Sequence, residues 1–143
     1  MEEDLSPAAY RALGEFRYQI RRFLHFSEEA AKGEGLEPQQ HQMLLAIRAL
    51  DPNQGPTIGQ LAEHLFIRHH SAVGLVDRLV ERGLVRRLRA REGDRRQVSV
   101  QLTREGEGKL KRLTHVHRTD LLTADPGLVR SLQALLERQD EQV

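Results

Sequence analysis

The hydrophobic pattern of the chain changes its period at Gly83, and this change limits what the middle of the sequence can fold into. Ahead of Gly83, apolar residues recur at helical spacing in two short segments, roughly 57–65 and 68–82. Beyond it, apolar and polar residues alternate on both sides of a turn at 91–94. Recurrence at helical spacing indicates an α-helix, whereas strict alternation indicates a β-strand. The pattern therefore predicts two short helices followed by a β-hairpin.

The two short helices carry their own start and stop signals. Thr57 and Gln60 have the spacing of a capping box, in which each side chain accepts a hydrogen bond from the other residue's amide. A brief turn at 66–67 separates the helices, and Gly83 follows the second helix where a left-handed residue is expected. Two short helices joined by a tight turn, directly ahead of a basic segment, predict a helix-turn-helix. The apolar stripe of its second helix consists of Ala72, Leu75, Val76 and Leu79.

The predicted hairpin belongs to a strongly basic segment. From Arg68 to Arg104 the chain has ten arginines and four acidic residues, a net charge of +6, whereas the rest has a net charge of −5. Such segregation gives a cationic patch on an acidic body, which is the footprint expected for a polyanionic partner. Arginine also suits bidentate contacts to phosphate or guanine better than lysine does. A hairpin with cations at its tip, directly after a helix-turn-helix, indicates a wing.

Longer amphipathic helices flank this segment on both sides. The pair Ser6-Pro7 opens a helix over roughly 8–32, and Pro38 starts a second one that ends at the breaker cluster 51–56. Thr103 caps a helix over roughly 103–123, and the pair Asp125-Pro126 opens a last one. The leucine and phenylalanine stripes of the terminal helices exceed what a small core can cover, so they are expected to be buried on another surface.

Several classes of protein are disfavoured by what the sequence lacks. Without cysteine it has no disulfide, zinc–cysteine site or thiol switch. No segment has the length of a membrane span and the acidic start lacks a secretory pattern, so a cytoplasmic protein is expected. Since no Gly-rich phosphate loop, nucleophile elbow or HExxH motif is present, we expect neither an enzyme nor a cofactor. Aromatic residues make up only 4% of the chain and none lies in the hairpin, which argues against RNA binding by stacking.

The motifs in and around the hairpin resemble those of the MarR (multiple-antibiotic-resistance regulator) family of transcriptional regulators. The most specific of them is an aspartate–arginine wing tip followed by an alternating strand and Thr-x-x-Gly. In this sequence the motifs are IGQLAEHL at 58–65, LVDRL at 75–79, ERGLVRR at 81–87, GDRR at 93–96 and VSVQLTREG at 98–106. The specific motifs thus cover about 58–106, and the order of the predicted helices covers essentially the whole chain.

The resemblance implies a mainly α fold: a winged helix-turn-helix with a two-stranded β-hairpin wing and terminal helices that form a dimerisation region. As a homodimer, the protein would place two recognition helices in successive major grooves of a palindromic operator, with the wings in the flanking minor grooves. The implied organisation is a single unit over 1–143, with dimerisation helices at 6–35 and 103–143 and a DNA-binding lobe at 36–102, whose recognition helix spans about 68–82 and whose wing spans about 84–102.

Two groups of residues are predicted to contact double-stranded DNA, one at the start of the recognition helix and one in the wing. The predicted set is Arg68, His69, His70, Ser71, Gly74, Arg78, Arg89, Arg91, Asp94, Arg95 and Arg96. The N-terminal turn of a recognition helix points into the groove, where histidine and serine can bond base edges or phosphates. By the resemblance, Arg96 enters the minor groove and Asp94 shapes the wing tip. The other wing arginines would contact the phosphate backbone.

Other interpretations of these residues stay open. His69 and His70 could be exposed without a role, and the wing arginines could be solvated charges of an ordinary hairpin. Asp77 is expected to have a structural role and not a DNA contact, because its carboxylate would repel a nearby phosphate. Arg78 could contact DNA or take part in a pairing between the helix and the wing.

The expected function is that of a sequence-specific transcriptional regulator, a repressor that a small-molecule effector releases from DNA. In the family that the chain resembles, an effector commonly binds between the first helices and the dimerisation helices. The candidates for such a pocket are Phe16, Phe23, His41 and Arg48, although apolar residues at this spacing are more often plain core.

Three alternatives remain. A metal-responsive regulator could use His25, His41 and His115, but plain core or surface histidines are the simpler interpretation, and no metal is expected. A dimeric module that binds DNA without sequence preference would also explain the charge pattern. A purely structural dimerising module would explain the helical stripes but not the arginine-rich hairpin.

Overall fold

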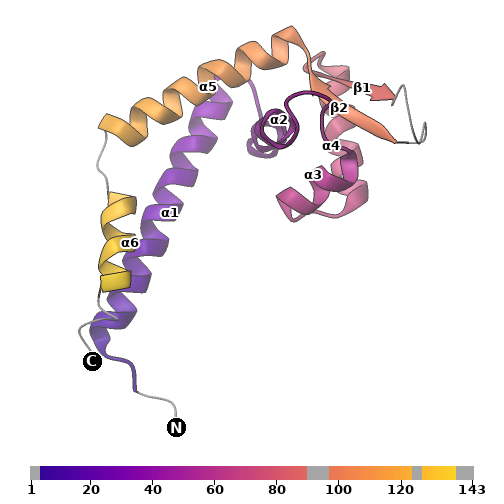
Figure 1. Ribbon diagram of the computed structural model, residues 1–143. Coiled ribbons are helices and arrows are strands. Elements are labelled where there is room, and N and C mark those ends of the chain that lie inside the picture. Colours follow the sequence, from indigo (N-terminus) through magenta and orange to yellow (C-terminus); the bar gives the residue numbers. More distant parts are fainter. Residues whose placement is uncertain (1–3, 90–96, 124–126, 138–143) are drawn as a thin grey trace. The chain divides into compact units, whose positions relative to one another are not determined.

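The described part of the protein consists of six helices and one two-stranded sheet. The computed structural model describes residues 4–89, 97–123 and 127–137. The elements along the chain are α1 (Pro7–Gly33), α2 (Pro38–Leu50), α3 (Ile58–Leu65), α4 (His69–Glu81), β1 (Val85–Arg89), β2 (Val98–Leu102), α5 (Arg104–Thr123) and α6 (Gly127–Glu137) (Figure 1). This order confirms the predicted mainly α fold with a helix-turn-helix and a hairpin wing.

The chain divides into two compact units. The central unit is Ala31–Thr114, and the terminal unit combines Met1–Ala30 with His115–Val143. The division falls inside α1 and α5, so each of these two helices contributes residues to both units. The helix-turn-helix and the described strands all belong to the central unit.

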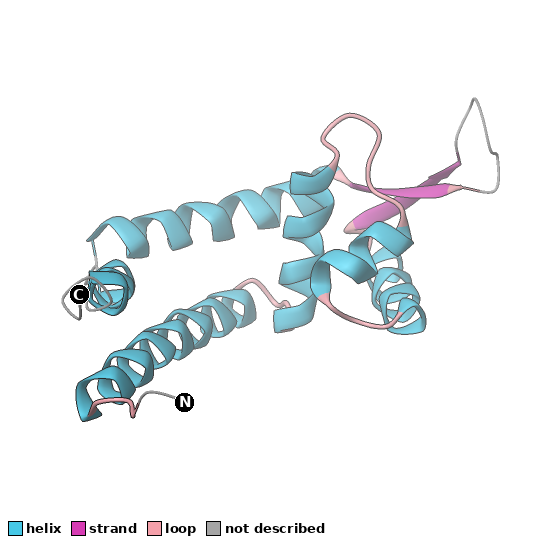
Figure 2. Cartoon of the chain, turned by 60° about the horizontal axis from the view of Figure 1, so that its bottom comes forward, coloured by secondary structure: helices cyan, strands magenta, loops and turns pink. Residues whose placement is uncertain are grey.

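The core of the central unit lies between the hairpin and the three helices α2, α3 and α4, which are grouped beside it in Figure 2. Each element presents one apolar face to this core, as its hydrophobic period requires. The predicted stripe of α4 is buried along its whole length. The largest side chains that are fully buried in this unit include Met43, Leu44, Leu61, Leu75, Leu79, Leu84 and Val100.

The hairpin is extended on one side by the segment that precedes α3. β1 and β2 are antiparallel, with Val85 opposite Leu102 at one end and Arg89 opposite Val98 at the other. The Val100 amide donates a 2.9 Å hydrogen bond to the carbonyl of Pro56, which lies just ahead of α3. This contact covers part of the free edge of β2 and connects the wing to the helix-turn-helix.

The first turn of α5 lies directly against the start of β1. Thr103 caps α5, because its Oγ1 accepts a hydrogen bond from the Gly106 amide at 3.1 Å. The same hydroxyl donates to the Gly83 carbonyl at 2.7 Å, and Gly83 has the left-handed conformation predicted for it, with φ of 72°. A Cβ on Gly106 would lie 2.0 Å from the Leu84 carbonyl oxygen, so only glycine fits there. The predicted cap at Thr103 is thereby confirmed.

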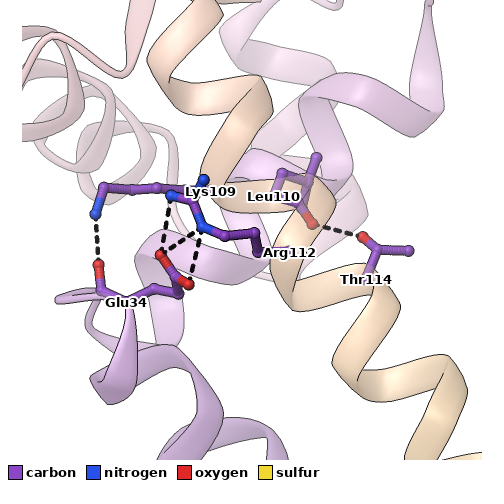
Figure 3. A network of polar contacts seen from close by, with 5 residues as sticks. All are labelled: Glu34, Lys109, Leu110, Arg112 and Thr114. Carbon is purple, nitrogen blue, oxygen red and sulfur yellow. Dashed lines mark hydrogen bonds and ion pairs between the residues drawn. The ribbon is translucent and has the colours of Figure 1, made fainter.

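A charged cluster joins the end of α1 to α5 within the central unit (Figure 3). The Glu34 carboxylate accepts hydrogen bonds from Arg112 Nε at 3.0 Å and Nη2 at 3.1 Å. Lys109 Nζ donates to the Glu34 carbonyl at 2.7 Å. The Arg112 guanidinium and the nearby ammonium of Lys109 hold the pKa of Glu34 below its ordinary value of 4.5, against the opposing effect of desolvation.

The terminal unit contains α6 beside α1 (Figure 1). A Cβ on Gly127 would lie 2.7 Å from Gln19 Oε1, and a small hollow has both Ala12 and Ser131 in its lining, so the two helices run antiparallel. In the same unit, His117 Nε2 and Ser27 Oγ share a 2.8 Å hydrogen bond. The rings of Phe23 and Phe26 meet the His117 ring edge-on.

Many apolar side chains of the terminal unit nevertheless remain at the surface. The exposed fraction is 65% for Tyr10, 78% for Leu122 and 58% for Leu136. Others that are at least 40% exposed are Leu5, Leu13, Tyr18, Leu24, Val116, Leu121, Val129 and Leu132. In the central unit, by contrast, large exposed apolar side chains are confined to Leu45, Leu50 and Phe66 among the described residues.

The close contact at Gly106 generates a prediction about stability. Replacing Gly106 with Ala should destabilise the protein by about 1–3 kcal/mol, because the new methyl group overlaps a backbone oxygen that cannot rotate away. Gly108→Ala is the matched control on the same helix, since its Cβ would meet only the flexible Arg112 side chain, at 3.6 Å. That variant should gain about 0.5–1 kcal/mol. Urea unfolding at one fixed protein concentration measures the free energy of unfolding of both variants. An equal change in this free energy for Gly106→Ala and Gly108→Ala would contradict the assigned contact.

The charged cluster predicts a pH-dependent contribution to stability. The folded protein lowers the pKa of Glu34, so this side chain stabilises the fold fully above its ordinary pKa of 4.5. The contribution is lost as the pH falls through the lowered pKa. The difference in Tm between the parent and Glu34→Gln should therefore be largest near neutral pH and shrink below pH 4.5. Thermal unfolding of both proteins from pH 7 to pH 3 measures it, and a difference that grows on acidification would have the wrong sign.

Candidate nucleic-acid interface

The N-terminal turn of α4 is exposed to solvent and carries no negative charge. Arg68 is the N-cap residue, with φ of −70° and ψ of 152°, and its side chain makes no capping hydrogen bond. Arg68, His69, His70 and Ser71 are all exposed, as predicted, and the first turn contains no acidic residue. The free amides and the partial positive charge of a helix N-terminus therefore face solvent together with a guanidinium. This arrangement can accept an anion or hydrogen-bond the edges of bases.

The remaining predicted positions of α4 lie further along the same helix. Gly74 is partly buried, and a Cβ added to it would meet no atom within 4 Å, so the surface beside it is open. Arg78 is exposed one turn later. The opposite face of the helix is buried in the core, so the orientation of the exposed face is determined by packing.

An ion pair connects α4 to the wing. Arg87 on β1 donates a hydrogen bond to the Asp77 carboxylate. This confirms the prediction that Asp77 is structural. Both side chains are partly exposed, at 33% for Arg87 and 53% for Asp77, so the pair contributes at most about 1 kcal/mol to stability. Its other effect is electrostatic, because Arg87 neutralises the acidic charge on this face of α4.

The described part of the wing carries arginines on β1. Arg86 Nη2 donates to Gln101 Oε1 across the sheet at 3.4 Å, and Arg89 is exposed at the last described residue of β1. Predicted contacts at the wing tip, Arg91, Asp94, Arg95 and Arg96, lie outside the described residues. The structure therefore places the base of the wing, and the minor-groove assignment of its tip stays a prediction.

The sequence did not reveal two polar hollows next to the wing. One, of about 710 Å³, lies between the segment before α3 and the sheet, and its lining includes Gln60, Arg89 and Gln97. The other, of about 490 Å³, is lined by Arg48, Arg86 and Arg104 together with two acidic side chains, Asp51 and Glu107. Arg48 Nε is 3.6 Å from Glu107 Oε1. Hydrophobic periodicity contains no signal for such hollows, since loop residues form much of their lining.

The predicted effector residues fall into both units. Phe16 and Phe23 are half-buried on α1 in the terminal unit. His41 is buried on α2 in the central unit, where Arg48 is exposed on the same helix and faces Glu107. The assignment of these four residues to one pocket stays a prediction.

The candidate metal ligands are also divided between the units, with His25 and His115 in the terminal unit and His41 in the central unit. No group of three histidine, aspartate or glutamate side chains that could hold a metal ion occurs within residues 4–89, 97–123 and 127–137. In that same part of the chain, no helix is both long and apolar enough to cross a membrane.

Residues 34–97 match the sequence model of the MarR family. The matched segment contains α2, the complete helix-turn-helix and β1. The resemblance inferred from the motifs is thereby confirmed for this part of the chain. No curated protein sequence matches the chain.

Several solved structures, two of them of proteins named as MarR or as MarR family, share the fold over nearly the whole chain. A MarR family protein from Bacillus stearothermophilus has a TM-score of 0.71 at 18% identity, covering 97% of this chain and 98% of that one. A mutant MarR from E. coli, complexed with operator DNA, has a TM-score of 0.64 at 26% identity and covers 90% of each chain. A mutant MepR from S. aureus, bound to an oligodeoxyribonucleotide, has a TM-score of 0.64 at 16% identity, covering 97% of this chain and 99% of that one.

The uncapped start of α4 predicts that replacing Arg68 with a capping residue raises stability and removes the predicted contact to DNA. Arg68→Ser supplies the missing cap and should be more stable than Arg68→Ala by about 1 kcal/mol. Both variants remove the same positive charge, so both should reduce the salt slope of log K for DNA by about 1. Urea unfolding and binding titrations at several salt concentrations test the two effects separately. Equal stability of the two variants would show that another group already satisfies this helix end.

Proposed function

We propose that this protein is a transcriptional regulator that binds a specific double-stranded DNA site as a homodimer. The observation that carries the proposal is the start of α4, where Arg68, His69, His70 and Ser71 are exposed and the first turn of the helix contains no acidic residue. α4 is the second helix of the helix-turn-helix and lies within the segment 34–97 that matches the family model, so we propose it as the recognition helix. An exposed helix N-terminus with a guanidinium and three hydrogen-bonding side chains suits base edges and phosphates in the major groove.

The wing complements this helix in the proposed complex. Arg89 extends the cationic surface from α4 along β1, and the tip residues Arg91, Arg95 and Arg96 continue it in the sequence. In the proposal, Arg96 enters a narrow minor groove, Asp94 shapes the tip and the other two arginines contact phosphates. The operator-bound E. coli MarR mutant supports DNA as the ligand, because it has the same fold at 26% identity.

A second copy of the chain is the proposed occupant of the terminal unit's apolar surface. Tyr10, Leu122 and Leu136 are each more than half exposed, and they come from three different helices of this unit. An apolar surface of this kind is unusual on a protein that stays monomeric. Two identical subunits with a two-fold axis would also match the symmetry of a palindromic site.

Repression released by a small-molecule effector is part of the same proposal. An effector that binds more tightly to a conformation of the protein that cannot bind DNA shifts the population toward that conformation. This holds wherever on the protein the effector binds. Phe16, Phe23, His41 and Arg48 are the proposed contacts. The alternatives are a dimer that binds DNA without sequence preference and a metal-responsive regulator. Among the described residues, no group of three possible metal ligands supports the metal-responsive alternative.

Selection of bound sites from random duplex DNA tests the function. We expect an enriched inverted repeat with half-sites about one helical turn apart. The affinity for this repeat should fall linearly on a plot of log K against log salt. Uniform weak binding to every duplex would support the non-specific alternative, and no binding at low salt would contradict the proposal.

Two variants and one addition sharpen this experiment. Arg96→Ala should weaken binding to the selected site without lowering Tm, whereas Arg17→Ala, an exposed arginine of the terminal unit, serves as the matched control. Equal affinity of the Arg96→Ala variant and the parent would contradict the wing assignment.

The effector part of the proposal is tested by repeating the titrations with a panel of small aromatic acids. If none of them changes the affinity for DNA or the Tm of the protein, the effector part is contradicted.

A further inference from the structure

Phe66 occupies a backbone conformation that favours glycine. Its φ of 56° and ψ of 41° are left-handed, and it ends α3 at the turn of the helix-turn-helix. Within the described residues, the other positions with positive φ are Gly35, Gly55 and Gly83, so Phe66 is the one side chain placed in this region. A bulky residue with positive φ is disfavoured by contact between its Cβ and the backbone.

The hydrogen bonds of the turn require this conformation. The Ile67 amide donates to the Ala62 carbonyl at 3.1 Å, and the Phe66 amide donates to the Glu63 carbonyl at 3.3 Å. These two bonds form a Schellman motif, whose left-handed position is usually glycine. Gly83 occupies the equivalent position at the end of α4, where the Leu84 amide donates to the Leu79 carbonyl at 3.0 Å. The backbone therefore requires the turn, but nothing in the backbone requires a phenylalanine.

Packing does not explain Phe66 either. The residue is 96% exposed, the highest value among the large apolar residues of the described chain. It therefore gains almost nothing from burial within its own chain. A side chain that is unfavourable for its backbone and unburied in its own fold is expected to serve a contact with another molecule.

The position of Phe66 indicates which molecule that is. It lies two residues before Arg68 and three before His69, so it continues the exposed start of α4. A phenyl ring cannot hydrogen-bond phosphate or a base edge. The apolar group that a base presents in the major groove is the C5-methyl group of thymine, which phenylalanine can contact.

We propose that Phe66 is a specificity-determining residue that packs against a thymine methyl group in each half-site. The inference rests on the proposed DNA-binding function and adds to it one apolar contact at the start of the recognition helix. It predicts that the selected operator has a thymine at one position in each half-site. That thymine belongs to the base pairs that lie nearest to the turn between α3 and α4 in the complex.

Two substitutions separate this role from folding. Glycine and asparagine both tolerate a left-handed conformation, so Phe66→Gly and Phe66→Asn should fold with an unchanged or higher Tm. Both should bind the selected operator about tenfold more weakly, which is the effect expected for losing a buried aromatic contact. The salt slope of log K should stay the same, because no phosphate contact is removed.

The thymine is identified by replacing each thymine of the operator with deoxyuridine, which removes only the methyl group. At one position per half-site the parent protein should lose affinity about fourfold, the effect of one methyl-sized group. Phe66→Gly should show no loss at that position. This non-additivity between a protein and a DNA substitution is what direct contact predicts.

Three outcomes would overturn the inference while leaving the DNA-binding function intact. In the first, Phe66→Gly binds the operator with the same affinity as the parent. In the second, Phe66→Gly binds more weakly but loses the same affinity as the parent at every deoxyuridine substitution. In the third, sedimentation shows that Phe66→Gly changes dimerisation while its affinity for DNA stays the same. If the parent protein selects no DNA sequence at all, the proposed function fails first and this inference fails with it.

Discussion

The contact between the first turn of α5 and the start of β1 is the constraint on which the rest of the central unit depends. The Leu84 carbonyl accepts the Thr103 amide at 3.0 Å, and Gly106 packs on the same oxygen. The adjacent Leu84 amide closes the end of α4. A few consecutive backbone atoms therefore join α4, the wing and α5, so the angle between helix and wing is determined by covalent geometry and close packing more than by side-chain charge.

The two ends of α4 are built alike but serve different purposes. Each is preceded or followed by a Schellman turn, with Phe66 in the left-handed position at one end and Gly83 at the other. A Cβ on Gly83 would meet only Glu105 Oε2, at 3.9 Å, so the glycine there is explained by its positive φ and not by crowding. The first turn needs the same backbone conformation, yet it carries a large apolar side chain that stands in solvent. The residue at the second turn therefore follows from the backbone alone, whereas the residue at the first turn does not.

Local signals predicted the fold well because each of them is a property of neighbouring residues. The capping box at Thr57, the left-handed Gly83 and the cap at Thr103 all depend on spacings of a few residues. The exposed start of α4 followed from its apolar stripe in the same way. Contacts between distant residues were beyond this reasoning: neither the Glu34–Arg112 pair nor the approach of Gly106 to Leu84 has a local pattern. The strain at Phe66 was hidden for a different reason, since the sequence shows a turn there but not its handedness.

The exposed apolar surface of the terminal unit has a consequence for the protein in a cell. If a second copy covers Tyr10, Leu122 and Leu136, as proposed, the protein has no single stability, because association and folding are then linked by mass action. Its folded fraction would then rise with its own abundance. A cell that makes few copies of the proposed regulator would lose occupied operators faster than in proportion to copy number, because dilution removes partners as well as protein. Gene dosage would then act as a control input in its own right.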